Sequence, residues 1–132
     1  MQLLAAIALA AFAVGCGNRY EITGRTPSPS GEIVALSYVG MGGGAAGWCS
    51  KMLALIPRDA SVHPEELDKP EYKKELGYVF SINCSIEFSV SWTSESELRI
   101  SYTIPVDRGA DTFQLAKGFN GRVRLVYEPT TP

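Results

Sequence analysis

The sequence has few of the side chains on which enzymes and metal sites depend. It contains a single histidine, His63, and no serine stands in a G-x-S-x-G motif. A histidine-based metal site or a serine–histidine pair would rest on His63 alone, so we expect no metal and no catalytic residues. Its acidic neighbours Glu65, Glu66 and Asp68 are typical of a solvated loop. The net charge of −2 lacks the basic excess that nucleic acid binding requires.

Charge is also missing from the N-terminal segment, where the first charged residue is Arg19. Leu3 to Val14 form an uninterrupted apolar run. As a helix this run would extend about 18 Å, well short of the ~30 Å hydrocarbon core of a membrane. Such a length is typical of the apolar region of a secretory signal peptide. We therefore expect residues 1–15 to be a signal peptide.

The end of this run, Ala13-Val14-Gly15-Cys16, resembles the lipobox of bacterial lipoproteins. Ala13 stands where leucine is usual, and Met1-Gln2 lack the usual lysine or arginine. The resemblance implies that Cys16 is lipidated and anchors the protein in the bacterial cell envelope. The alternatives are an ordinary signal peptide with a cysteine near the cleavage site and a buried N-terminal helix. Because Gly17 is not the aspartate that retains enterobacterial lipoproteins at the inner membrane, the outer membrane facing the periplasm is favoured.

The two other cysteines, Cys49 and Cys84, remain as an even pair once Cys16 is assigned to a lipid. Disulfides persist in exported proteins, so we predict that Cys49 and Cys84 are bonded. The bond would close a loop of about 35 residues and stabilise the fold by about 4 kcal/mol. Two buried free thiols are the alternative.

Composition divides the first half of the mature chain into segments. Residues 16–31 are polar and rich in proline, serine and glycine, which predicts a flexible tether after the lipidated cysteine. Glu32–Val39 is rich in β-branched and aromatic residues and predicts a strand that stops at a glycine cluster. Trp48–Ile56 predicts a second strand. The charged segment from Ala60 to Gly77 predicts a surface loop with one short helix.

The clearest periodic pattern lies in Tyr78–Trp92, where every even position is apolar. Such alternation predicts a strand with one face on the core, and Cys84 lies on that face. The run is longer than the usual strand of 3 to 10 residues, so we expect a bulge or break near Asn83. Leu98–Ile104 resumes the alternation and should form an antiparallel hairpin with the preceding run.

A last pair of predicted strands, Thr112–Phe119 and Arg122–Tyr127, flanks the dipeptide Asn120-Gly121. This dipeptide favours the positive φ angles of a type I′ turn. We expect one mainly β-domain over residues 32–128, with a frayed tail at 129–132. Its predicted architecture is a small antiparallel sandwich or open barrel of about six strands with at most one short helix.

The glycine cluster Gly42-Gly43-Gly44-Ala45-Ala46-Gly47 satisfies G-x-G-x-x-G after a predicted strand, the pattern of a dinucleotide-binding loop. The segment that follows is too short before Pro57 to supply the helix of a βαβ unit, so we expect no nucleotide and no other cofactor. The exposed backbone and the neighbouring tryptophan are instead a candidate partner-binding loop. Its residues are Gly40, Met41, Gly42, Gly43, Gly44 and Trp48.

Short motifs elsewhere carry a further resemblance. They are Ser28–Ala35, Gly42–Gly47, Val90–Thr93 and Glu97–Tyr102. Together they resemble a group of small uncharacterised bacterial envelope proteins with an S-P-D-G-like opening, a G-G-A-T-T-G-like loop and a tryptophan-led final hairpin. Ser30 replaces the usual aspartate, and Ala45-Ala46 replace the threonine pair. The resemblance implies a β-rich fold and an envelope location, without an established activity.

These observations predict a membrane-anchored, non-enzymatic module that binds an envelope protein or another envelope component. A more specific alternative is an inhibitor, immunity or exclusion lipoprotein that blocks an envelope enzyme or receptor. A small envelope hydrolase is the enzymatic alternative. A cleft that joins His63 to two acidic side chains would favour the enzyme, whereas an exposed patch around residues 40–48 would favour binding.

Overall fold

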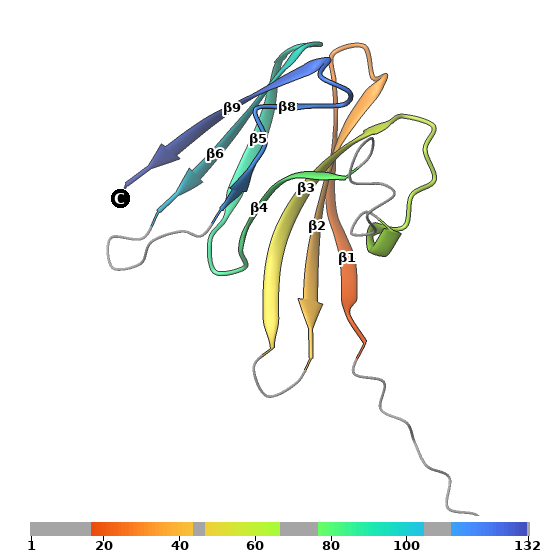
Figure 1. Ribbon diagram of the computed structural model, residues 1–132. Coiled ribbons are helices and arrows are strands. Elements are labelled where there is room, and N and C mark those ends of the chain that lie inside the picture. The colour runs from red at the N-terminus through yellow and green to blue at the C-terminus, as the bar shows by residue number, and fades with distance from the viewer. Residues whose placement is uncertain (1–16, 44–46, 67–76, 105–111, 132) are drawn as a thin grey trace, which may run out of the picture.

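The computed structural model describes residues 17–43, 47–66, 77–104 and 112–131. These residues form two β-sheets that pack against each other, so the sandwich is the architecture found (Figure 1). The five-stranded sheet has the order β1-β2-β3-β4-β7, and the four-stranded sheet has the order β5-β6-β9-β8. The strands are β1 Arg19–Pro27, β2 Ile33–Gly42, β3 Trp48–Pro57, β4 Tyr78–Asn83, β5 Phe88–Ser94, β6 Glu97–Thr103, β7 Phe113–Gln114, β8 Lys117–Gly118 and β9 Val123–Thr130.

Strand β1 corrects the prediction of a flexible tether over residues 16–31. Arg19–Pro27 pairs with β2 along its whole length, from Arg19 opposite Met41 to Pro27 opposite Val34. The far end of β1 is also fastened to the other sheet, because the indole N–H of Trp92 donates to the Thr26 carbonyl at 2.9 Å. An edge strand needs apolar residues on one side only, which is why a polar composition was misleading here.

The turn between β1 and β2 follows from Ser28-Pro29-Ser30-Gly31. The Gly31 amide donates to the Ser28 carbonyl at 2.8 Å, with Pro29 in the second position that its fixed φ favours. Gly31 has a φ of 80°, which glycine adopts without strain. The Ser30 amide donates to the Glu95 carboxylate of the β5–β6 turn, so this segment also contacts the second sheet and lowers the pKa of Glu95.

The alternating run from Tyr78 to Trp92 is broken near Asn83, as predicted. The Asn83 side chain accepts from the Ser85 amide at 2.9 Å, and the chain then crosses from β4 in one sheet to β5 in the other. Most even positions nevertheless face one core, because the two sheets enclose it from opposite sides. Tyr78 is an exception: an irregularity in the β3–β4 pairing turns it to the outer face of the five-stranded sheet.

The C-terminal region departs from an all-antiparallel arrangement. The expected strand 112–119 is divided between β7 in the five-stranded sheet and β8 in the four-stranded sheet, and β9 then pairs with β6 in parallel. The turn at Asn120-Gly121 is confirmed, with φ angles of 55° and 78°. The expected fraying at 129–132 is wrong for Pro129 and Thr130, which lie in β9 opposite β6.

Strand β3 shows why some of these strands are apolar on both sides. Its residues Leu53 and Leu55 face the core between the sheets, whereas Met52, Ala54 and Ile56 belong to a second cluster on the outer face. That outer cluster is partly covered by the segment after β3, which packs Ala60 and Val62 on it and leads to a short 3-10 turn, Pro64–Glu66 (η1). No helix long and apolar enough to cross a membrane occurs among the described residues.

The hydroxyl of Tyr127 joins the two sheets. It donates to the Leu115 carbonyl at 2.7 Å and lies 3.2 Å from the Val79 carbonyl. Burial raises the pKa of Tyr127 well above the ordinary value of 10.0, because burial disfavours the charged phenolate. The contribution of Tyr127 to stability is therefore complete below pH 10 and is lost as the pH rises above that value.

We accordingly expect the free energy of unfolding of the wild type to fall more steeply above pH 10 than that of Tyr127→Phe. At pH 7 the variant should be less stable by about 1 kcal/mol, because it lacks one hydrogen bond. Urea unfolding of both proteins at pH 7, 9 and 11 measures the difference. Equal pH slopes would contradict the role given to this hydroxyl.

Candidate functional site

Exposed apolar side chains gather at one end of the five-stranded sheet. Here the beginning of β1 lies beside the end of β2 and the beginning of β3 (Figure 1). Tyr20 is opposite Gly40, and Gly42 is opposite Trp48. We call this end the sheet tip and define it by Tyr20, Ile22, Met41 and Trp48.

Two glycines of β2 are needed for the packing of Trp48. A Cβ atom on Gly42 would lie 1.8 Å from the indole Nε1, and one on Gly40 would lie 3.1 Å from the far edge of the indole. The indole therefore lies directly over glycine backbone, with the Tyr20 ring centroid 6.4 Å from its own. The candidate loop begins later than expected, because Gly40, Met41 and Gly42 belong to β2.

Exposed apolar side chains occur on both faces of the tip. Met41 is 42% exposed, Trp48 40% and Ile22 38%. Because side chains alternate along a strand, Met41 lies on the opposite face from Tyr20 and Trp48. On its side is a shallow hollow of about 580 Å³. The hollow is lined by Asn18, Arg19, Tyr20, Glu21, Val39 and Met41.

Replacing Gly42 with alanine should move the Trp48 indole without unfolding the domain. The new methyl group would occupy the position of Nε1, but alanine itself is tolerated in a strand, so we expect a stability change within about 1 kcal/mol. In a Trp92→Phe background the emission of Trp48 should shift to longer wavelength. Gly24→Ala is the matched control, because a Cβ there meets its nearest atom at 3.9 Å. An unchanged spectrum of the Gly42 variant would disprove this packing.

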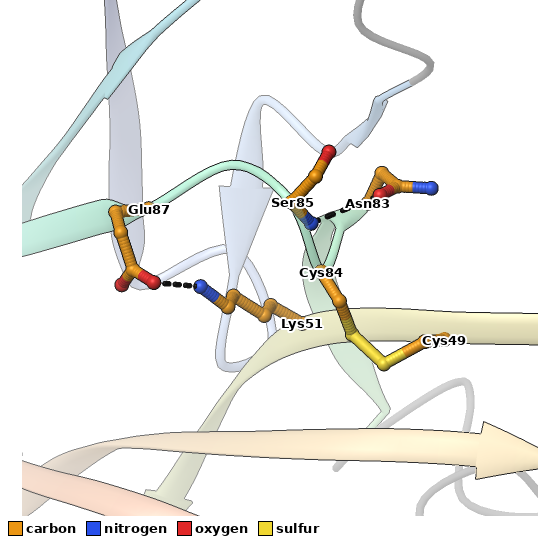
Figure 2. The surroundings of a disulfide bond; sticks show 6 residues. All are labelled: Cys49, Lys51, Asn83, Cys84, Ser85 and Glu87. Atoms are coloured by element: carbon orange, nitrogen blue, oxygen red, sulfur yellow. Dashed lines mark hydrogen bonds and ion pairs between the residues drawn. A yellow bond between two sulfur atoms is a disulfide. The ribbon is translucent and has the colours of Figure 1, made fainter.

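A disulfide between Cys49 and Cys84 lies directly beside the tip, which confirms the predicted pairing (Figure 2). The Cα atoms are 5.5 Å apart, and the Cys84 amide donates to the Cys49 carbonyl at 3.4 Å. Both cysteines are half-buried, at the margin of the core. On the same side, Lys51 of β3 forms an ion pair with Glu87 just before β5. The bond thus fixes the beginning of β3 to the end of β4 next to Trp48.

A cluster of charged side chains at the other end of the molecule has a structural role, because its members contact one another. Glu97 of β6 accepts from Arg124 of β9, and the Thr93 hydroxyl donates to the same carboxylate. The hydroxyl and the guanidinium lower the pKa of Glu97. Arg122 lies over the Phe119 ring at 5.3 Å. The contact between Glu97 and Arg124 joins the β5–β6 hairpin to the C-terminal hairpin, and the other two contacts lie within one hairpin each.

Several predicted site residues lie apart or outside the described residues. Cys16 and Gly44 lie outside them, as does Asp68, so the lipidation site has no structural description. His63 is exposed just before η1. Within the described ranges, no group of three or more histidine, cysteine or acidic side chains could hold a metal ion.

Sequence reasoning missed half of the tip. Met41 and Trp48 were included in the candidate loop, but Tyr20 and Ile22 were assigned to the tether. A signal was present, because Tyr20 and Ile22 alternate with the polar Glu21 and Thr23 as in a half-buried strand.

Comparison of the chain with protein-family models, curated proteins and solved structures gives no match. The fold and the site therefore define the protein by its class alone. It is a small disulfide-linked β-sandwich with an exposed apolar tip on one sheet.

Proposed function

We propose that the protein is a membrane-anchored lipoprotein of the bacterial cell envelope that acts as a non-enzymatic binding module. Cys16 carries the lipid, and the sheet tip is the surface that contacts an envelope component. The proposed location is the outer membrane, facing the periplasm, because Gly17 follows the lipidated cysteine.

The bond between Cys49 and Cys84 is the observation that carries the anchor. It uses two of the three cysteines and leaves Cys16 as the cysteine without a cysteine partner in this chain. Cys16 is also the residue that follows the uncharged apolar run and small residues typical of a lipobox. Disulfides persist in exported proteins, so the bond also supports a location in the cell envelope.

The exposed tip supports a binding role. Among the residues that the structure describes, five large hydrophobic side chains are exposed, and three of them belong to the tip, namely Ile22, Met41 and Trp48. Apolar groups gathered at one end of a small domain are typical of interaction surfaces. The disulfide holds Cys49 to Cys84 directly beside Trp48, which lowers the conformational freedom that this residue loses on contact.

Growth of bacteria that express the protein with labelled palmitate tests the anchor. We expect the label in the wild type and none in Cys16→Ser, which should also leave the membrane fraction. Gly17→Asp is the matched control: it should keep the label but move the protein to the inner membrane. Unlabelled wild-type protein, or Cys16→Ser that is processed and membrane-bound as before, would overturn the proposal.

A further inference from the structure

We infer that the sheet tip rests on the lipid surface of the membrane that holds the anchor. This inference rests on the proposed function and names the envelope component that the tip contacts. The tip is thus a second membrane contact beside the lipid, made by aromatic and apolar side chains at the interface.

The length of chain before β1 is the first reason. Only Gly17 and Asn18 separate Cys16 from Arg19, the first residue of β1. Three fully extended residues span at most about 10 Å. A flexible tether over residues 16–31 would instead have placed the domain at a mean distance of about 20 Å from Cys16. Because β1 is folded and begins at the tip, a lipid on Cys16 holds this end of the domain against the bilayer.

The chemistry of the tip is the second reason. Tyr20 and Trp48 combine an aromatic ring with a polar group, the combination that is enriched at membrane interfaces. Residues 33–50, which include β2 and the first three residues of β3, contain no charged side chain. The nearest charges on β1 are Arg19 and Glu21, which line the hollow beside Met41. Arg19 lies opposite Met41, and its long side chain extends back to the headgroups while Met41 and Trp48 reach the acyl boundary.

The arrangement of the apolar groups favours lipid over a protein partner. Met41 and Trp48 lie on opposite faces of the same hairpin end, so one flat surface cannot cover both. A fluid interface surrounds a projecting hairpin and contacts both faces together. The insertion depth of interfacial helices, about 5–10 Å, corresponds to about two or three residues of an extended strand.

The two tryptophans of the chain provide a direct test. Trp48 lies at the tip, whereas Trp92 is hydrogen-bonded to Thr26 at the other end of β1. Thr26 is six residues along the strand from Tyr20, a distance of about 20 Å. Trp92→Phe leaves Trp48 as the reporter, and Trp48→Phe leaves Trp92. Each protein is isolated from bacterial membranes and reconstituted in phosphatidylethanolamine–phosphatidylglycerol vesicles that contain phosphatidylcholine brominated near the headgroup. We expect the bromine to roughly halve the emission of Trp48 and to leave that of Trp92 unchanged.

A matched pair of charge substitutions sharpens the test. Met41 and Phe113 are equally exposed, at 42% and 43%, but Phe113 lies in β7 on the other edge of the sheet. Met41→Glu should lift the tip from the interface and restore most of the Trp48 emission. Phe113→Glu should leave the quenching unchanged. Equal effects of the two substitutions would overturn the assignment of the tip.

The outcomes separate this inference from the proposed function. Vesicle-bound protein whose Trp48 is not quenched would overturn the membrane contact and leave the anchor intact. If the Trp48 emission in that case shifted to shorter wavelength only as the protein concentration rises, the tip would contact a second copy of the chain instead of lipid. Protein that does not sediment with vesicles would overturn the anchor. In that case the membrane contact of the tip is tested separately, after Cys16 has been coupled to a maleimide lipid. Absence of Trp48 quenching in the coupled protein would overturn the membrane contact as well.

Discussion

Replacing both Cys49 and Cys84 with alanine should lower the free energy of unfolding by about 4 kcal/mol. The bond joins residues 35 positions apart, and closing a loop of that length removes this much conformational entropy from the unfolded chain. Domains of this size are stable by only about 5–15 kcal/mol, so the loss is a large share of the total. Urea unfolding at 25 °C, followed by far-ultraviolet circular dichroism, measures it.

Reduction of the wild type is the control for this prediction. Dithiothreitol should destabilise the wild type by nearly the same amount and should leave the double variant unchanged. The effect acts through the unfolded chain, so the folded variant should keep the far-ultraviolet circular dichroism spectrum of the wild type. A variant as stable as the oxidised wild type would contradict the prediction.

Phe80→Ala should have a comparable effect and lower the free energy of unfolding by about 3–5 kcal/mol. Phe80 is fully buried in β4 of the five-stranded sheet. Its ring meets Phe88 at 5.2 Å, Tyr102 at 5.6 Å and Tyr127 at 5.7 Å between ring centroids, and these belong to three strands of the other sheet. Truncation would therefore leave a cavity where the two sheets meet. The midpoint of urea unfolding should fall accordingly.

Phe113→Ala is the matched control, because the same substitution is made on an exposed ring. Phe113 is 43% exposed and contacts Tyr78 at 5.2 Å at the edge of the sheet. We expect its stability to change by less than about 1 kcal/mol. If the two phenylalanine variants lost equal stability, Phe80 would not be the centre of the core.

The alternation of apolar residues predicted a sandwich or an open barrel because it reports which face of a strand is buried. In Tyr78–Trp92 the pattern continued almost unbroken while the chain changed sheets, since Phe80 in one sheet and Phe88 in the other face the same core. The pattern therefore predicted the burial, and the length of the run predicted the break at Asn83. It carried no information about which sheet each half would join.

Other features depend on contacts that local patterns do not encode. After β6 the chain passes through β7 in the other sheet and then through β8, and this path brings β9 beside β6 in the parallel direction. Strand β1 is held by backbone pairing and by Trp92, which is distant in sequence. The sequence predicted Met41 and Trp48 as site residues but not Tyr20. Its alternation with Glu21 indicates a strand, but its place beside Trp48 depends on the pairing of β1 with β2.

The pairing of β1 with β2 has a mechanical consequence for a domain held at Cys16. Strand β1 runs away from the tip along its own axis, so a pull on the domain away from the anchor acts along the strand. The cross-strand hydrogen bonds are perpendicular to that direction and are loaded together in shear rather than opened one after another. From β2 the tension passes to β3, where the covalent bond at Cys49 transmits it to β4. The strand that looked like a tether is thus the element through which the whole sandwich resists extension.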